Sequence, residues 1–214
     1  MQNPYSGPRQ IGQYDFAWLI LQLERYGKQQ FGERFVIREV DHAVIRVLLV
    51  YFLADAAQAE QLGIDLSKGI LLTGPIGCGK TSLMSLMRLV PAPERGFTLR
   101  SVRDVTFEFI KEGYDVIHHR YSLLSYTHDR PKTYCFDDLG AEQTLKYYGN
   151  ECNVMAELIL SRYDHYMFSN MITHLTTNLS ATEIEAAYGP RVRSRMREMF
   201  NLVAFDRVVQ DKRL

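Results

Sequence analysis

An excess of charge of either sign is missing from this sequence, since 25 lysines and arginines balance 25 aspartates and glutamates. A chain of zero net charge has no overall positive field to attract nucleic acid, so any such contact must come from a local patch. Cysteine is also scarce. Three are present, an odd number without a paired framework, and reduced thiols in a cytoplasmic protein are the simplest interpretation.

Long apolar runs are absent as well. The most apolar stretch, residues 43–57, is interrupted by Arg46 and Asp55 and is too short to span a bilayer. Residues 1–10 are polar, contain two prolines and lack the basic-then-apolar order of a signal peptide. We therefore expect a cytoplasmic protein with no membrane contact. A length of 214 residues suits one domain with a short N-terminal appendage.

Hydrophobic spacing predicts helices and strands that alternate along the chain. Apolar residues three and four positions apart predict helices, and short apolar runs bounded by glycine predict buried strands. The predicted helices cover residues 16–27, 40–61, 81–90, 103–111, 150–168 and 193–199, with one more capped by Ser180 and Glu183. The predicted strands cover 69–73, 97–102, 133–136, 172–177 and 202–205, while 114–132 has no clear pattern. This order predicts an α/β fold with a parallel sheet flanked by helices.

A phosphate-binding loop follows the first predicted strand and opens a helix, matching G-x-x-x-x-G-K-[ST] at every position. Its glycines let the backbone wrap an anion with N–H groups pointing inward, and the helix N-terminus adds partial positive charge. We expect Lys80 to reach the β- and γ-phosphates of ATP or ADP and Thr81 to ligate Mg²⁺. The expected nucleotide contacts are Gly74, Pro75, Ile76, Gly77, Cys78, Gly79, Lys80, Thr81 and Ser82.

Two carboxylates follow the third predicted strand, at the sheet edge where parallel sheets bind ligands. We expect Asp137 to hold Mg²⁺ through water, and Asp138 to polarise the attacking water as a general base. Asn178 follows the fourth predicted strand and is expected to orient the same water. A solvated acid pair and a capping asparagine are the alternative interpretations.

Four arginines alternate near the C-terminus, at positions 191, 193, 195 and 197. They form either a solvated basic face or the source of a guanidinium that stabilises phosphate charge, in the same subunit or in a neighbour. Sequence spacing does not choose which arginine has that role.

Three segments give the chain its resemblance to a known family: Phe136–Gly140, Thr176–Asn178 and Tyr188–Met196. Over about residues 68–205 it resembles the AAA+ ATPases of the DnaC/IstB group, which are bacterial helicase loaders and transposition helpers. The resemblance implies that Asn178 is at the sensor-1 position and that Arg195 is the arginine finger that completes a neighbour's site. It also implies a homo-oligomer that engages a replicative helicase or a transposase. The lid is expected to be reduced or absent.

The leading hypothesis is therefore an ATP-hydrolysing loader or helper with a short docking or linker segment at residues 1–32 and the ATPase domain at 33–214. A nucleotide-gated binding module with negligible hydrolysis is the first alternative, and a small P-loop kinase is the second. Single-stranded DNA is a possible further partner. The residues that could form a basic patch for it are Arg103, Lys111, Arg120 and Arg130.

Overall fold

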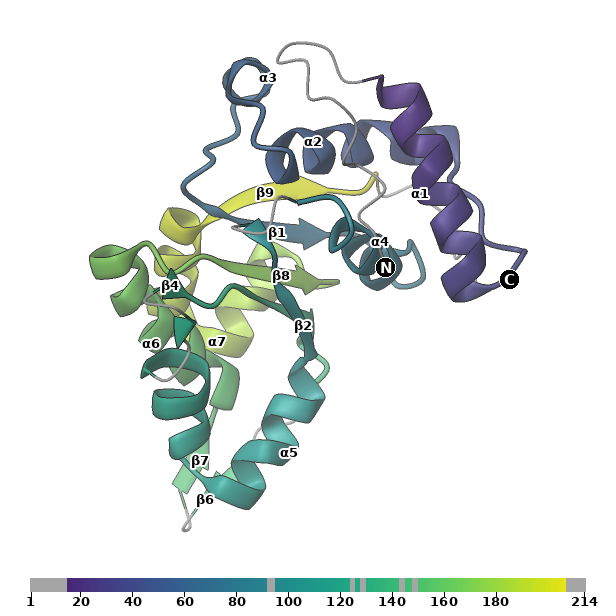
Figure 1. Ribbon diagram of the computed structural model, residues 1–214. Helices are drawn as coiled ribbons and strands as arrows, with labels where there is room; N and C mark the ends of the chain where they lie inside the picture. Colours follow the sequence, from purple (N-terminus) through teal and green to yellow (C-terminus); the bar gives the residue numbers. More distant parts are fainter. Residues whose placement is uncertain are drawn as a thin grey trace.

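A five-stranded parallel sheet forms the centre of the protein, with strand order β2-β5-β8-β1-β9 (Figure 1). The computed structural model describes residues 15–91, 95–123, 126–127, 130–142, 145–147 and 150–206. The strands are β1 Gly69–Thr73, β2 Thr98–Ser101, β5 Tyr134–Leu139, β8 Thr173–Thr177 and β9 Phe200–Ala204. The parallel sheet that the sequence predicts is thus confirmed.

Helices cover both faces of this sheet. They are α1 Phe16–Phe31, α2 His42–Phe52, α3 Ala56–Gln61, α4 Lys80–Met87, α5 Val102–Glu112, α6 Val154–Ser169 and α7 Ala181–Met199. The helices α1, α2 and α4 lie on one side of the sheet, and α6 and α7 on the other (Figure 1). The strand β1 shows why both faces of the sheet are apolar. Ile70 and Leu72 pack in the core formed with α1, α2 and α4, whereas Leu71 between them packs in the core formed with α6 and α7.

The first helix is longer than predicted, because Gly27 does not end it. The helix continues to Phe31, and the N–H of Gly32 closes it on the carbonyl of Lys28. A Cβ at position 27 would lie 2.2 Å from ring atoms of Phe35, so this glycine allows a close contact. Leu19 and Leu23 of the helix are buried in the same core as β1 and α4.

Two other predicted helices have different boundaries. The 40–61 helix is divided into α2 and α3 at Ala54, which has a φ of 57°, and the carboxylate of Asp55 caps α3 by accepting from the N–H of Gln58 at 3.0 Å. The helix predicted to begin at residue 150 begins at Val154, because Asn153 is its cap. Residues Asn150–Cys152 instead form the strand β7, which pairs with β6 Leu145–Tyr147.

The region without a sequence pattern contains a π-helix at Val116–Leu123, followed by the short strands β3 Tyr126–Thr127 and β4 Arg130–Pro131. At the other end, the predicted capping box of Ser180 and Glu183 is confirmed, and the helix it opens continues through a kink at Gly189 to include the predicted basic helix. Residues 1–14 of the expected docking segment and residues 207–214 lie outside the described part. No helix in the described ranges is long and apolar enough to cross a membrane.

Candidate nucleotide-binding site

The loop between β1 and α4 adopts a compact turn at the carboxyl edge of the sheet. Gly77 and Gly79 have φ values of 79° and 99°, which side-chain-bearing residues rarely adopt. Gly74 is required for a different reason, since a Cβ there would lie 2.7 Å from the Cβ of Phe205 and 3.0 Å from the Sγ of Cys78. The loop is therefore packed against the end of β9, with its backbone free of side chains at the positions expected to wrap a phosphate.

Lys80 lies in the floor of this loop and is buried. Its Nζ donates to the carbonyl oxygens of Gly74 at 2.8 Å and Pro75 at 2.9 Å, with the Sγ of Cys78 at 3.9 Å. These contacts hold an ammonium at the first turn of α4, where the partial positive charge of the helix N-terminus adds to it. A buried ammonium beside a helix N-terminus is a combination that suits an anion.

Thr81 and Asp137 come from distant parts of the sequence and meet at this edge. The Oγ1 of Thr81 donates to Oδ2 of Asp137 at 2.9 Å, although the strand β8 lies between β5 and β1. The other carboxylate oxygen, Oδ1, accepts from the hydroxyl of Thr176 at 2.7 Å. A hydroxyl and a carboxylate this close are oxygen ligands of the kind that Mg²⁺ uses beside phosphates.

Asp138 adopts a left-handed backbone conformation, with a φ of 67°. The regular pairing of β5 with β8 is interrupted between Phe136 and Leu139, which is where the two aspartates lie. Such an irregularity changes the direction of the side chains, and it is common beside active sites. The side chain of Asp138 is exposed, whereas that of Asp137 is buried.

A cavity of about 660 Å³ lies beside these groups, although the buried Asp137 is not among its lining residues. Lys80, Thr81, Ser82, Asp138 and Asn178 all line it, so the structure brings the predicted phosphate, base and sensor residues into one space. Asn178 is exposed at the end of β8. Asp138 and Asn178 therefore both face the space beside the loop, as their predicted roles require.

The opposite wall of this cavity was not found from the sequence. It consists of the segment that joins α1 to α2, and the residues of this segment that line the cavity are Arg34, Phe35, Val36, Ile37, Arg38 and Asp41. A short apolar run between two arginines is present in the sequence, but nothing in it points to a loop that lies 40 residues further along the chain. The segment therefore contributes three apolar side chains, two arginines and one aspartate to the lining of the cavity.

The helix α1 holds this wall in place. The backbone N–H of Ile37 donates to Oε2 of Glu24 at 3.0 Å, and Oε1 of the same carboxylate pairs with Lys28 at 2.9 Å. The hydrogen bond from Lys28, followed by the one from Ile37, lowers the pKa of Glu24 from its usual value. A charged acceptor at this point fixes the segment, because hydrogen bonds to ionised groups are among the stronger ones.

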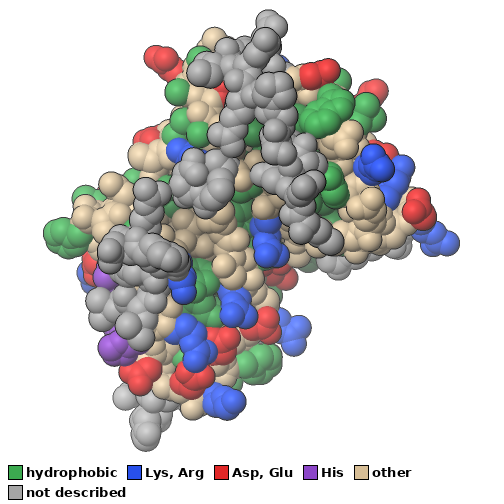
Figure 2. Space-filling view, viewed as in Figure 1, with side chains coloured by type: hydrophobic (Ala, Val, Ile, Leu, Met, Phe, Trp, Pro, Cys, Tyr) green, Lys and Arg blue, Asp and Glu red, His purple; other side chains and the backbone are tan. Residues whose placement is uncertain are grey.

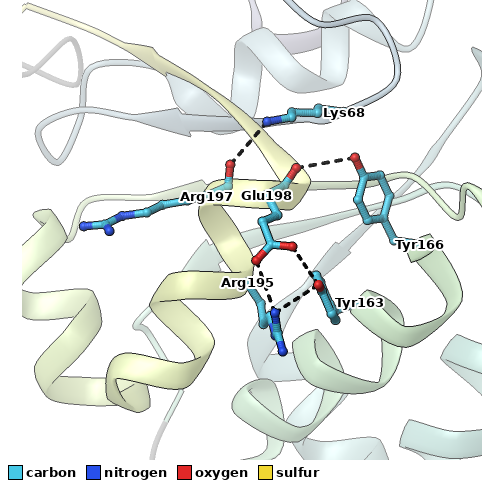
Figure 3. Close-up of polar contacts among 6 residues, drawn as sticks. All are labelled: Lys68, Tyr163, Tyr166, Arg195, Arg197 and Glu198. Carbon is cyan, nitrogen blue, oxygen red and sulfur yellow. Dashed lines mark hydrogen bonds and ion pairs between the residues drawn. The ribbon is translucent and has the colours of Figure 1, made fainter.

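Arg195 lies away from the loop, in the last turns of α7. The strands of the sheet are parallel and α7 runs back from their carboxyl ends, so Arg195 is near the amino edge and the loop is at the carboxyl edge. Its guanidinium stacks on the ring of Tyr163 at 4.4 Å and donates to Oε1 of Glu198 at 3.2 Å, while the Tyr163 hydroxyl donates to Oε2 of Glu198 at 2.6 Å (Figure 3). The structure does not bring Arg195 together with the other predicted site residues of its own subunit.

The other three arginines of this element have different surroundings. Arg193 pairs with Glu185, and Arg191 and Arg197 are exposed. The side chain of Arg197 points away from the Arg195 cluster, while its carbonyl accepts from Lys68 at 3.4 Å (Figure 3). Arg193 and Arg197 also line a second cavity of about 660 Å³ between α7 and the β1 and β9 strands.

A metal at this site would depend on phosphate and water for most of its ligands. In the described ranges, no group of three or more His, Cys, Asp or Glu side chains is arranged to hold a metal ion. Thr81 and Asp137 supply two oxygens, which fits Mg²⁺ because this ion is usually bound through one or two protein carboxylates together with substrate phosphates.

The residues suggested for a DNA-binding patch are partly neutralised. Arg120 donates to Glu108 at 2.9 Å and to Glu112 at 2.6 Å. Figure 2 shows acidic side chains among the basic ones over the region of α5. Arg103 and Lys111 are exposed on α5, and the side chain of Arg130 lies outside the described part. DNA binding stays a prediction.

Comparison with known proteins shows which solved structures share this fold. No protein-family model matches the sequence, and no curated protein matches it. The structure of the DnaC helicase loader is 19% identical, with a TM-score of 0.52 over 79% of this chain and 92% of that one. DnaA from Aquifex aeolicus, bound to AMPPCP, is 18% identical, with a TM-score of 0.51 over 84% of this chain and 50% of that one. DnaI is 19% identical, with a TM-score of 0.49 over 80% of this chain and 87% of that one. The DnaC and DnaA matches show that this chain shares the fold of these two proteins.

Proposed function

We propose that this chain, which has the AAA+ fold seen in the DnaC helicase loader, binds ATP with Mg²⁺ and hydrolyses it slowly, with stimulation by a partner protein. One observation carries the proposal: Thr81 of the phosphate loop and Asp137 of β5 are 2.9 Å apart, beside the buried ammonium of Lys80. A triphosphate and its divalent cation need this combination of an anion-binding loop, a hydroxyl and a carboxylate. Bound Mg²⁺ would neutralise charge on the phosphates.

The chain's own groups have separate tasks in this proposal. Lys80 and the loop N–H groups bind the phosphates, while Asp138 and Asn178, which line the same cavity, orient a water toward the γ-phosphate. The apolar segment Phe35–Ile37 offers a wall against which a flat adenine base could pack. Because the loop glycines carry no side chains, the space next to the phosphates would stay open.

We further propose that Arg195 acts on the nucleotide of a neighbouring copy. Its position near the amino edge of the sheet separates it from its own phosphate loop, so a second subunit is needed to bring a guanidinium to the site. The assembly would be a homo-oligomer that acts as a helicase loader or as a helper in DNA replication or transposition. The partner would be a replicative helicase or a transposase.

Nucleotide binding is tested first, with Lys80→Ala compared with Lys111→Ala as a matched control. Both variants lose one lysine, but Lys111 is exposed on α5, away from the loop. We expect the first to lose at least tenfold in affinity for ATP and the second to match the unmodified protein in a titration with a fluorescent ATP analogue. Equal affinities for Lys80→Ala and the unmodified protein would contradict the proposed site.

The neighbour's arginine is tested by mixing two inactive variants. A Lys80→Ala subunit keeps Arg195 but lacks a working loop, whereas an Arg195→Ala subunit has the loop but no finger. We expect each alone to release little phosphate and the mixture to recover part of the turnover. Arg197→Ala, which removes an exposed arginine two residues away, is the control. Undiminished turnover by an Arg195→Ala protein that still self-associates would refute the assignment.

A nucleotide-gated binding module is the alternative that a specific observation favours. Arg195 is engaged within its own subunit by Tyr163 and Glu198, and a guanidinium that kept these contacts in an assembly would not reach a neighbour. In this case ATP would change the binding of a partner with no phosphate release. Measuring phosphate release with and without single-stranded DNA and a replicative helicase separates the two functions.

A further inference from the structure

Thr176 connects both members of the acidic pair through one buried hydroxyl. It lies on β8, and no part of it is exposed. Its Oγ1 donates to Oδ1 of Asp137 at 2.7 Å and accepts from the backbone N–H of Asp138 at 2.8 Å. A hydroxyl has one proton to donate and can accept at the same time, so both contacts can form together.

The contact with Asp137 fixes the direction of its carboxylate. With Oδ1 bound by Thr176, the plane of the carboxylate is set, and Oδ2 stays directed at the Oγ1 of Thr81. A carboxylate oxygen that accepts one hydrogen bond still has a lone pair for a cation or for its water. Groups that hold a metal-binding carboxylate in this way typically control the affinity for the metal.

The contact with Asp138 replaces a missing backbone pair. The regular pairing of β5 with β8 stops after Phe136 and resumes at Leu139, so Asp138 has no paired residue on β8. The hydroxyl of Thr176 accepts from the N–H of Asp138 instead, at the residue whose φ is 67°. A non-glycine residue in this conformation needs such support from its surroundings.

We propose that Thr176 is a positioning residue for the nucleotide site, which sets the Mg²⁺ affinity through Asp137 and the direction of the catalytic carboxylate through Asp138. The inference rests on the proposed function. A purely structural role for a buried threonine in a strand would predict loss of stability without a specific effect on Mg²⁺. The neighbouring residue makes the two roles separable.

Thr177 is the matched control. It is also completely buried on β8, and its Oγ1 also makes two contacts, to the carbonyl of Leu139 at 2.7 Å and from the N–H of Leu179 at 3.1 Å. Neither contact involves Asp137 or Asp138. Valine removes the hydroxyl and keeps the shape at either position, whereas Thr176→Ser keeps the hydroxyl and removes a methyl group.

The experiment is a titration of Mg²⁺ into each variant with a fluorescent, non-hydrolysable ATP analogue. We expect Thr176→Val to raise the Mg²⁺ concentration at half-saturation by roughly 10- to 100-fold. The affinity for the ATP analogue in EDTA, without Mg²⁺, should stay unchanged within about twofold. Thr176→Ser should restore the normal midpoint, and Thr177→Val should keep it. Urea denaturation checks that each variant is folded.

Two results would overturn the inference: an unchanged Mg²⁺ midpoint in folded Thr176→Val, or an equal shift in Thr177→Val. If Thr176→Val does not fold, Thr176→Cys keeps a weaker donor of similar size, and we expect a smaller shift in the same direction. No shift in that variant also overturns the inference. If the unmodified protein binds no nucleotide with or without Mg²⁺, the proposed function itself fails.

Discussion

Acid should destabilise this protein through one buried histidine. His174 lies on β8, and its Nδ1 accepts from the backbone N–H of Ile70 at 3.0 Å. The rings of Tyr51, Phe52 and Phe97 surround it at centroid distances of 5.1–5.7 Å. Burial lowers the pKa of His174 from 6.5 to about 3, with smaller contributions in the same direction from two arginines, Arg162 and Arg95.

Acid destabilises the protein because the folded and unfolded chains bind different numbers of protons at His174. Between pH 6.5 and 3 the unfolded chain holds a proton on this imidazole and the folded chain does not. Acid therefore favours unfolding in this window, while the histidine makes no such contribution above pH 6.5. A full one-proton difference changes the free energy of unfolding by about 1.4 kcal/mol per pH unit. Between pH 6 and pH 4 the loss attributable to His174 is ~2.5 kcal/mol, because the unfolded imidazole is not fully protonated at pH 6; this is a large part of a typical domain's 5–15 kcal/mol.

The measurement is urea denaturation at pH 7, 6, 5 and 4 for the unmodified protein and for His174→Asn. Asparagine keeps an acceptor for the N–H of Ile70 but cannot take up a proton in this range. We expect the variant to be less stable at pH 7 and to lose less stability on acidification, so that the two curves converge. His118→Asn, at an exposed position, is the control. Parallel curves for His174→Asn and the unmodified protein would refute the reasoning.

Three other predictions concern packing. Arg162→Met should lower the free energy of unfolding by about 3 kcal/mol or more in urea denaturation. The buried guanidinium donates to the carbonyls of Lys132 and Ile172, and methionine would leave both carbonyls unsatisfied. A loss below ~0.5 kcal/mol would contradict this prediction. Gly74→Ala should abolish nucleotide binding and lower the free energy of unfolding by about 1–3 kcal/mol. The added Cβ would lie 2.7 Å from the Cβ of Phe205. Retained binding in a nucleotide titration would show that the loop can move. Cys135 should resist iodoacetamide at pH 8 until urea unfolds the protein, because burial raises its pKa well above the usual value, and mass spectrometry of native labelled protein would reveal any error.

Local sequence patterns were sufficient to predict the five strands of the central sheet and the glycine-rich turn after β1. A buried parallel strand is apolar on both faces, so residues 69–73 form a continuous apolar run, and the loop after it depends on glycines whose conformations few other residues adopt. The capping box at Ser180 is equally local, since its two hydrogen bonds join residues three apart. Patterns of this kind were not sufficient where a glycine had two possible roles. Gly27 has the sequence appearance of a helix stop, but it is a contact point for Phe35 within a helix.

Residue patterns alone identified the side chains whose chemistry suits a nucleotide: one lysine, one threonine, two aspartates and an asparagine in the loop or at strand ends. Their distances from one another depend on the folded sheet, because the strand order places β8 between β5 and β1 and so brings Thr176 to Asp137 and Asp137 to Thr81. The wall at Phe35–Ile37 and the surroundings of Arg195 were likewise decided by packing between distant segments. Periodicity reports which face of an element is buried, and it contains no information about the element that covers that face.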